Sequence, residues 1–306
     1  MPHRFAHTPP DTTCPERGQA TKRPMTNPLP IVRTPAALRA AVRSWQQQGQ
    51  RVAFVPTMGA LHAGHLALVT KGLTLADVAV ASIFVNPKQF GAGEDLDRYP
   101  RDEAGDAVKL AGAGCSLLYA PDVATMYPPG FASFVRVSGL PDLLCGRVRP
   151  GHFDGVATVV AKLLSAAQAD VAVFGEKDWQ QLAIIRRMSA DLDIGTEIHG
   201  CAIVRDDDGL ALSSRNAYLS ADERARALAL PRALNATREA ILSGMPVAAA
   251  LAAGERSIKA AGFVRLDYLD LVDGETLHSL GTPAPGARLM GAGVIGTTRL
   301  IDNIAL

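Results

Sequence analysis

The 306-residue sequence lacks an apolar run of about 18 residues, the length that a membrane-spanning helix needs. Its first residues also lack the apolar core of a signal peptide, so neither membrane insertion nor export is predicted. Lys and Arg total 31 and Asp and Glu total 30, which leaves a net charge of +1 and no long basic run. A charged face for nucleic acid is therefore not expected.

Cysteine is scarce: the chain has four, and they form no Cys-x-x-Cys motif. The wide spacing of Cys14, Cys115, Cys145 and Cys201 predicts neither a zinc site nor a disulfide framework. Reduced thiols in a cytoplasmic enzyme are the simpler interpretation. Apolar residues, by contrast, make up 48% of the chain, which is ample for one or two hydrophobic cores. The length favours two domains of ~150 residues each.

The N-terminal segment differs in composition from the rest of the chain. The first 30 residues contain seven prolines, few large apolar residues and no periodic pattern. We therefore predict that residues 1–26 form a disordered extension. Met25 stands just before the ordered pattern begins, so two alternatives stay open: a true start at Met25, and a flexible tail of unknown use.

From residue 34 to residue 204, short apolar strands alternate with helices. The pattern predicts strands at 51–55, 77–85, 115–119, 171–174 and 197–204. It predicts helices at 35–47, 101–111, 156–167 and 179–192, and one more that begins near residue 62. Such alternation is typical of an α/β domain with a Rossmann-like parallel sheet covered on both faces. Ligands of these sheets bind beyond the carboxyl ends of the strands.

The pattern changes after residue 204. The run Arg-Asp-Asp-Asp-Gly at 205–209 predicts an Asp-Gly turn, and a metal site is the less favoured alternative because the spacing matches no calcium loop. Two helices at 221–240 and 247–261 follow, and then two β-like runs at 265–272 and 287–295. We predict a larger domain over 27–203 and a smaller α+β domain over 204–306.

The most informative motif is Pro-Thr-Met-Gly-Ala-Leu-His-Ala-Gly-His at 56–65, between an apolar strand and an apolar helix. It places the imidazoles of His62 and His65 on the first helical turn. Free backbone N–H groups and the positive end of the helix dipole favour a phosphate there. Gly64 lets a ligand approach the backbone. The alternative is that both histidines merely begin a helix, and this motif alone does not decide between the two interpretations.

Two further motifs offer groups for a polar substrate. Phe-Val-Asn-Pro-Lys-Gln-Phe at 84–90 follows a strand and presents the amides of Asn86 and Gln89, which can bind a hydroxyl or a carboxylate. Arg-Pro-Gly-His-Phe-Asp-Gly-Val at 149–156 delivers Arg149 and His152 just before a helix, and arginine suits a carboxylate or a phosphate. A polar turn and a solvated loop charge are the respective alternatives.

The motif Gly-Glu-Lys-Asp-Trp-Gln-Gln at 175–181 again links a strand to a helix. Gly175 permits close backbone approach, Lys177 can neutralise phosphate charge, and Asp178 can accept hydrogen bonds from a ribose diol. Gln181 faces the same side as these residues one helical turn later. Capping of the helix by Asp178 is the alternative, although it explains that residue alone.

The last motif, Leu-Ser-Ser-Arg-Asn at 212–216, brings two hydroxyls and a guanidinium together as an anion clamp, with a serine-rich turn as the alternative. Together and in this order, the motifs resemble the pantothenate synthetase (pantoate–β-alanine ligase) family of the His-x-Gly-His nucleotidylyltransferase superfamily. The resemblance covers about residues 29–306, including Arg-Leu-Ile-Asp-Asn at 299–303.

The resemblance implies the ATP-dependent condensation of (R)-pantoate with β-alanine, with a pantoyl-adenylate as intermediate. The products are pantothenate, AMP and pyrophosphate, in the biosynthesis of pantothenate and coenzyme A. It also implies a cytoplasmic homodimer with a Rossmann-like domain, a smaller cap domain and hinge closure. The partners expected are ATP, pantoate, β-alanine and Mg²⁺, with the metal held mainly by the ATP phosphates.

Carried over motif by motif, the resemblance also implies roles for individual residues. The catalytic residues would be His65, as proton donor to the leaving pyrophosphate, with His62 and Lys177. Pantoate and β-alanine would be bound by Gln89, Gln181, Asn86 and Arg149. The ATP site would comprise Met58, Gly59, His62, Gly64, His65, Gly175, Lys177, Asp178, Val204, Leu212, Ser213, Ser214 and Arg215.

Three positions depart from the family pattern: Ala63 and Trp179, and Cys145, where the family often has Glu. None of these residues has a central role in the resemblance. The residues leave two other functions as alternatives. An adenylyltransferase that leaves AMP on its product gives no reason for Gln89 and Gln181. A regulatory nucleotide-binding module has no need of Lys177 together with the clamp at 213–215.

Overall fold

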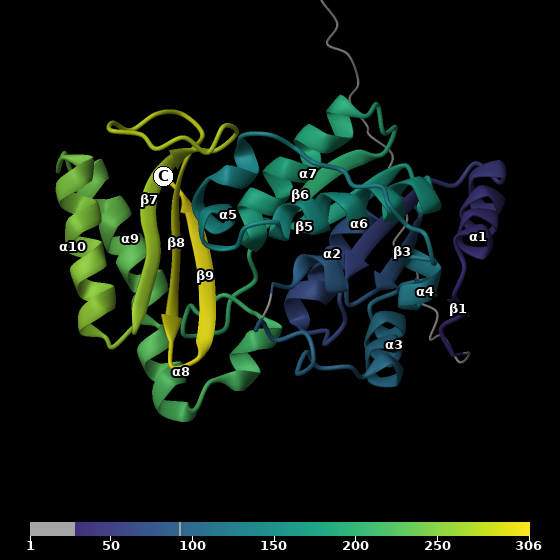
Figure 1. Cartoon of the computed structure of the whole chain (residues 1–306), viewed down its shortest axis with the longest axis horizontal. Coiled ribbons are helices and arrows are strands. Elements are labelled where there is room, and N and C mark those ends of the chain that lie inside the picture. Colours follow the sequence, from purple (N-terminus) through teal and green to yellow (C-terminus); the bar gives the residue numbers. More distant parts are fainter. Residues whose placement is uncertain (1–27, 92) are drawn as a thin grey trace, which may run out of the picture.

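The computed structural model describes residues 28–91 and 93–306. The disorder predicted for residues 1–26 and the alternative start at Met25 lie outside the described residues. Within the described part of the chain, no helix combines the length and the apolar character that crossing a bilayer requires. Figure 1 shows two sheets, one in each half of the molecule, and each is packed against helices.

The larger sheet has six strands in the order β1-β4-β3-β2-β5-β6, and its neighbouring strands are all parallel. From β2 the chain winds outward through β3 and β4, and then crosses back to place β5 on the other side of β2. The order therefore reverses between β2 and β5, and such switch points are where α/β sheets bind ligands. The strands are β1 (Ile31–Val32), β2 (Val52–Thr57), β3 (Val78–Ile83), β4 (Leu117–Tyr119), β5 (Val171–Gly175) and β6 (Glu197–Cys201).

Helices cover both faces of this sheet, as the nearly continuous apolar strands predict. In β2, the side chain of Phe54 belongs to the core beneath three helices, and that of Val55 to the core beneath two others. The first group comprises α1 (Pro35–Gln47), α6 (His152–Ala167) and α7 (Trp179–Asp191). The second group comprises α2 (Ala63–Leu75) and α3 (Glu103–Gly112). The predicted Rossmann-like α/β architecture is confirmed.

The smaller sheet is antiparallel and has the order β7-β8-β9. Two helices pack on one of its faces, and a third follows the last strand of the larger sheet along the chain (Figure 1). The predicted α+β character of this half is confirmed. The strands are β7 (Arg265–Asp273), β8 (Ala287–Ile295) and β9 (Thr298–Ala305), and the helices are α8 (Ala221–Ala227), α9 (Ala229–Leu242) and α10 (Val247–Ala260).

Several predicted boundaries are wrong, and two of them have a clear local reason. The helix predicted over 221–240 is two helices, and the second accommodates Pro231 in its first turn, where the missing N–H costs no hydrogen bond. Helix α6 begins at His152 rather than at 156, because Gly151 takes a left-handed φ of 79° and turns the chain directly into it. The strand predicted over 197–204 ends at Cys201.

Short elements that the sequence pattern did not predict connect the main ones. They are α4 (Val123–Met126), α5 (Leu144–Val148) and the 3₁₀ turns η1 (Pro87–Gln89), η2 (Leu140–Asp142), η3 (Glu176–Asp178) and η4 (Ser214–Tyr218). The predicted Asp-Gly turn is confirmed. The N–H of Gly209 donates to the carbonyl of Asp206 at 2.8 Å, and Arg224 pairs with Asp206 and Asp208 at 2.7 and 2.8 Å.

Candidate active site

The loops that follow β2 and β5 meet at the switch point of the larger sheet, and a cavity of about 240 Å³ opens between them. Of the residues predicted for the site, Gly59 alone does not line this cavity. The predicted residues that do line it are Met58, His62, Gly64, His65, Asn86, Gln89, Arg149, Gly175, Lys177, Asp178, Gln181, Val204, Leu212, Ser213, Ser214 and Arg215.

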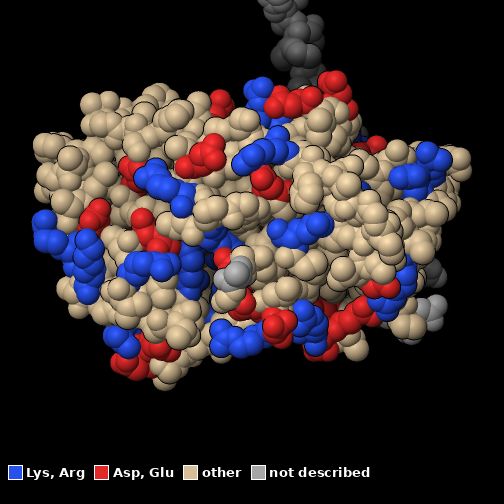
Figure 2. Space-filling view, viewed as in Figure 1, with Lys and Arg blue, Asp and Glu red and all other residues tan. Residues whose placement is uncertain are grey.

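A second cavity of about 410 Å³ adjoins the first and extends to the C-terminal sheet. Lys177, Asp178 and Arg215 line both cavities. Tyr268 and Arg299 line the second one from β7 and β9. Figure 2 shows Lys and Arg side chains gathered in the middle of this face, beside the C-terminal strands. Acidic side chains lie among them, but more basic than acidic residues line the second cavity.

The two motif histidines form a reciprocal cap at the start of α2. His62 is the N-cap residue, and its Nδ1 accepts a hydrogen bond from the N–H of Gly64 at 3.1 Å. The Nδ1 of His65 accepts from the N–H of His62 at 3.4 Å, and the ring centroids lie 4.1 Å apart. Because each Nδ1 is an acceptor, each neutral ring carries its proton on Nε2. The pair thus provides two N–H donors at a helix N-terminus.

Burial keeps these imidazoles neutral. It is the main cause that lowers the pKa of His62 from 6.5 to about 4, with the charge of Lys177 as the next cause. Burial likewise lowers the pKa of His65 to about 3, with His62 as the next cause. A third histidine, His152, has its pKa lowered to about 4 by burial and then by Arg149. At pH 7 the three rings are therefore donors and acceptors without charge.

These lowered pKa values predict that the protein loses stability between pH 7 and pH 5, above the pH range in which carboxylates titrate. A histidine whose folded pKa lies below 6.5 stabilises the fold fully above pH 6.5, and this contribution is lost as the pH falls below that value. Between pH 7 and pH 5, His65 and His152 should each lower the free energy of unfolding by about 2 kcal/mol. Urea unfolding at the two pH values measures the loss. H65Q and H152Q should each reduce it, and equal stability at both pH values would contradict the shifts.

Lys177 and Asp178 lie in η3, directly after β5. In the described part of the chain, the bonds of Lys177 to other residues involve its backbone carbonyl, which accepts from the amide of Asn303 at 3.0 Å, and not its ammonium. Asp178 begins α7 without a side-chain capping bond, so the capping alternative for this residue is wrong. An ammonium and a carboxylate thus face the cavity with their bonding capacity available to a ligand.

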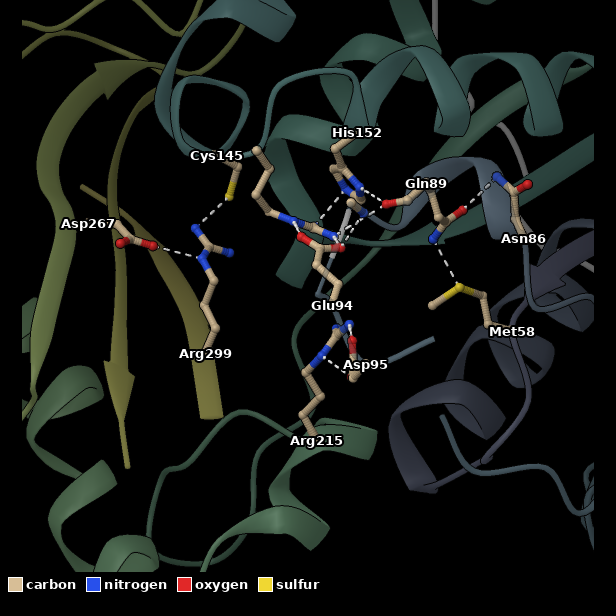
Figure 3. Close-up of polar contacts among 12 residues, drawn as sticks. Met58, Asn86, Gln89, Glu94, Asp95, Cys145, His152, Arg215, Asp267 and Arg299 are labelled. Atoms are coloured by element: carbon tan, nitrogen blue, oxygen red, sulfur yellow. Dashed lines mark hydrogen bonds and ion pairs between the residues drawn. The ribbon is translucent and has the colours of Figure 1, made fainter. Parts of the chain in front are cut away.

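The two arginines of the motifs have carboxylate partners instead. Arg149 binds Glu94 through Nε at 2.7 Å and Nη2 at 2.6 Å. Burial alone would raise the pKa of Glu94, but the hydrogen bonds and charge of Arg149 lower it to about 2. Arg215 binds Asp95 in the same way, through Nε at 3.0 Å and Nη2 at 2.9 Å, and Figure 3 shows the Asp95 carboxylate beside the Arg215 guanidinium. An anionic substrate that binds either arginine would therefore have to displace the carboxylate from the guanidinium or share the guanidinium with it.

The amide motif forms a network around η1. Asn86 donates to the Oε1 of Gln89 at 3.1 Å and to the carbonyl of Gly155 at 3.1 Å, and it accepts from Tyr127 at 2.8 Å. Gln89 donates in turn to the sulfur of Met58 at 2.9 Å (Figure 3). This chain of contacts fixes the Gln89 amide at the wall shared by the loops after β2 and β3. Asn86 itself is 1% exposed, so it holds the motif rather than reaching far into the cavity.

Sequence reasoning missed the residues that support the site from other segments. Glu94 and Asp95 belong to no motif and to no predicted strand or helix, and Arg299 and Tyr268 lie in the half that the resemblance implies to be a cap, without predicted contacts to the site. Arg299 donates to Asp267 at 2.7 Å and to the sulfur of Cys145 at 3.3 Å (Figure 3). The departure at Cys145 therefore lies at a contact between the two halves. No spacing in the sequence signals these pairings.

Comparison with known proteins places the chain. The family described as Pantoate-beta-alanine ligase matches residues 30–305. A pantothenate synthetase of Rhodospirillum rubrum is 58% identical over 279 residues, which are 91% of this chain and 99% of that protein. The crystal structure of pantothenate synthetase from Thermus thermophilus has a TM-score of 0.86 and 52% identity, and the match covers 90% of this chain and 99% of that one.

A third comparison concerns a structure with ligands. Pantoate-beta-alanine ligase from Francisella tularensis, described as complexed with beta-gamma ATP and beta-alanine, has a TM-score of 0.77 and 33% identity. That match covers 90% of this chain and 97% of the other. Family match, sequence identity and fold agree over nearly the whole of the described chain, and the chain belongs to the pantoate–β-alanine ligase family.

Proposed function

We propose that this chain joins (R)-pantoate to β-alanine at the expense of ATP, as a step in pantothenate and coenzyme A biosynthesis. A pantoate carboxylate oxygen attacks the α-phosphorus of ATP, the bond to the β-phosphate breaks, and pyrophosphate leaves. The ammonium group of β-alanine loses a proton, and the resulting neutral amine attacks the acyl carbon of the pantoyl-adenylate; AMP leaves, and the nitrogen loses a second proton as the amide forms. The observation that carries the proposal is the cavity where Lys177, two imidazole donors and the Gln89 amide face one another.

The catalytic roles follow from charge and from hydrogen-bonding capacity. Lys177 would offset the charge that develops on the departing pyrophosphate, and such fixed charges are usually the largest catalytic contribution. His62 and His65 would donate from Nε2 to phosphate oxygens. Because the pKa of His65 is about 3 in the free protein, we propose that it acts as a proton donor only after the charge of ATP has raised that pKa.

The other residues would hold the substrates in line. Asp178 and Gly175 would take the ribose, Val204 and Leu212 would flank the adenine, and Gln89 and Gln181 would bind pantoate. Ser213, Ser214 and Arg215 would contact the phosphates, with Met58, Gly59 and Gly64 shaping the loop and Asn86 and Arg149 supporting the pantoate end. Orientation of this kind can supply ~7–11 kcal/mol of the barrier reduction.

Other parts of the proposal rest on the family resemblance. Mg²⁺ would enter with the phosphates of ATP and neutralise part of their charge; among the described residues, no cluster of three His, Cys, Asp or Glu side chains could hold it. We further propose a cytoplasmic homodimer, and a domain boundary near residue 204 that lets the half with the smaller sheet close over the cleft. Loss of turnover on chelation of Mg²⁺ would test the first of these points.

Exchange of labelled pyrophosphate into ATP tests the proposed reaction. With Mg²⁺ and pantoate present and β-alanine absent, we expect exchange, because adenylate formation is reversible. Without pantoate the exchange should vanish. If AMP forms only when β-alanine is added and no exchange occurs, the two-step mechanism is wrong. No ATP turnover under either condition would favour the nucleotide-binding module, and a stable adenylylated product would favour the adenylyltransferase.

A further inference from the structure

Two charged side chains of α3 hold one residue of the loop that carries the histidines. The Oδ1 of Asp106 accepts the N–H of Leu61 at 2.9 Å, and the Nζ of Lys109 donates to the carbonyl of Leu61 at 3.0 Å. The two side chains also pair with each other at 3.2 Å. Leu61 directly precedes His62, the N-cap of α2. Both backbone polar groups of the residue that leads into the histidine helix are therefore fixed from a different helix.

The loop needs outside support because its backbone conformation is unfavourable. Gly59 has a φ of 84° and Ala60 a φ of 51°, so two consecutive residues are left-handed and one of them has a side chain. Such conformations persist where the surroundings determine them. The carbonyl of Ala60 accepts from the hydroxyl of Ser214 at 3.0 Å. Ser214 thus holds the loop at Ala60, the second residue of this strained pair, and the two α3 side chains hold it at the next residue, Leu61.

The environment of Asp106 argues against a merely structural role. Its side chain is 1% exposed, and its Oδ2 has no hydrogen-bond partner among the described residues. A buried carboxylate with one oxygen unsatisfied is costly, and an apolar side chain would pack α3 against the sheet without that cost. Its satisfied oxygen serves the loop, since it binds Leu61 and Lys109. The carboxylate is therefore explained by the loop rather than by the packing of α3.

Lys109 also contributes to the charge that the histidines experience. Its positive charge disfavours protonation of both rings and so lowers the pKa of His62 and of His65, in addition to their burial. The other titratable and charged groups that act on the two rings lie in the loops after β5 and β6 and on the rings themselves. Lys177 and Asp178 act on both rings, Asp206 acts on His62, and His62 acts on His65, whose ring centroid lies 4.1 Å from its own.

We propose that Asp106 and Lys109 are a positioning pair for adenylate formation. They hold Leu61 so that the Nε2 donors of His62 and His65 meet the phosphates, and neither side chain touches the substrate. The proposal rests on the proposed function of the site. It extends the machinery of that site to α3, a helix that lies outside the sequence motifs.

The K109M substitution tests the pair, because it removes the charge and keeps the aliphatic stem. We expect the maximal rate of pantoate-dependent pyrophosphate exchange to fall between about 10- and 100-fold, since small misplacements of reacting groups have effects of this size. The melting temperature should change little, because the Lys109 side chain is 44% exposed. The acid limb of the rate profile should move to higher pH as the imidazoles lose a neighbouring positive charge.

Three further variants make the result decisive. K109R keeps the charge and a donor, and should stay within about threefold of the parent rate. D106N keeps an acceptor for Leu61 but loses the ion pair, and should resemble K109M. K259M is the matched control: Lys259 forms an intrahelical pair with Glu255 at 3.2 Å on α10, away from the cleft, and its loss should leave exchange unchanged.

The outcomes separate this inference from the proposed function. If the parent protein shows no exchange, the proposed function fails. If the parent is active and both K109M and D106N match its rate, its KM for ATP and its pH profile, the positioning role is overturned and the function stands. An equal loss in K109R, with the melting temperature reduced in step with activity, would also overturn it, because packing alone would then explain the effect.

Discussion

Replacement of Lys177 by Met is expected to lower the rate of pantoyl-adenylate formation by about 10²- to 10³-fold, the cost of removing one preorganised group from a developing charge. The reason is that its ammonium lines both cavities, whereas Arg149 and Arg215, which also line both, are each paired with a carboxylate. Phosphate charge that develops in the transition state would therefore lose the cation best placed to meet it. Single-turnover formation of the adenylate measures the effect directly.

The fold should survive this change, because the backbone of Lys177 rather than its ammonium is held by Asn303. K162M is the matched control, since Lys162 lies on α6, with its ammonium 5.0 Å from the ring centroid of Phe131, and lines neither cavity. Near-normal adenylate formation in K177M, or an equal loss in K162M, would show that the charge at this position is not what stabilises the leaving group. In K177M the pKa of His62 should also rise, because Lys177 is the largest charge effect on that ring.

The parallel sheet and most of the candidate site could be predicted from sequence for one physical reason. Parallel strands are buried on both faces, so they appear as short apolar runs, and their carboxyl ends lie at the same edge of the sheet. Motifs that follow such runs must therefore lie near one another. The apolar runs do not indicate the order of the strands in the sheet. The reversal of that order between β2 and β5 is what brings His65 and Lys177 close together.

Strand β9 illustrates what the periodic pattern could not predict. Asp302 and Asn303 are 3% and 1% exposed, so buried polar residues replace the apolar ones that mark a strand. They are satisfied at long range: Asp302 binds Arg205 at 2.7 and 2.8 Å, and Asn303 donates to the backbone of η3. A local signal did exist, since Gly296 and Thr297 form a two-residue connection between β8 and β9, typical of a hairpin.

The partners of the site residues could not be predicted from the sequence, for a related reason. Glu94 pairs with Arg149 across 55 positions of sequence, and Leu61 with Asp106 across 45. Charges at such separations look like ordinary surface residues, because nothing local constrains where they point. Motif reasoning finds the groups that contact a ligand, whereas the groups that hold those residues in place become visible only when the helices are packed.

Gly155 is the position where a single added methyl group should damage the pantoate side of the site most. A Cβ at Gly155 of α6 would lie 2.8 Å from the Cα of Gln89 and closer still to the carbonyl oxygen of Lys88. Both obstacles are backbone atoms, so no rotamer change relieves them, and η1 must move away from α6. The Asn86 bond to the Gly155 carbonyl, 3.1 Å long, would break with that movement. Gln89 would then leave the position from which it contacts Met58.

We therefore expect G155A to reduce pantoate-dependent exchange by about 10²-fold, the effect of roughly 1 Å of misplacement, and to raise the KM for pantoate more than that for ATP. Overpacking should also cost about 1–3 kcal/mol of stability, so the KM ratio must be measured on folded protein. G112A is the matched control, because Gly112 of α3 has open space where a Cβ would stand. If the methyl group acts through Gln89, G155A should add little to the defect of Q89A, because the effects of substitutions at coupled positions do not add. Additive losses, or equal changes in both KM values, would place the pantoate subsite elsewhere in the cleft.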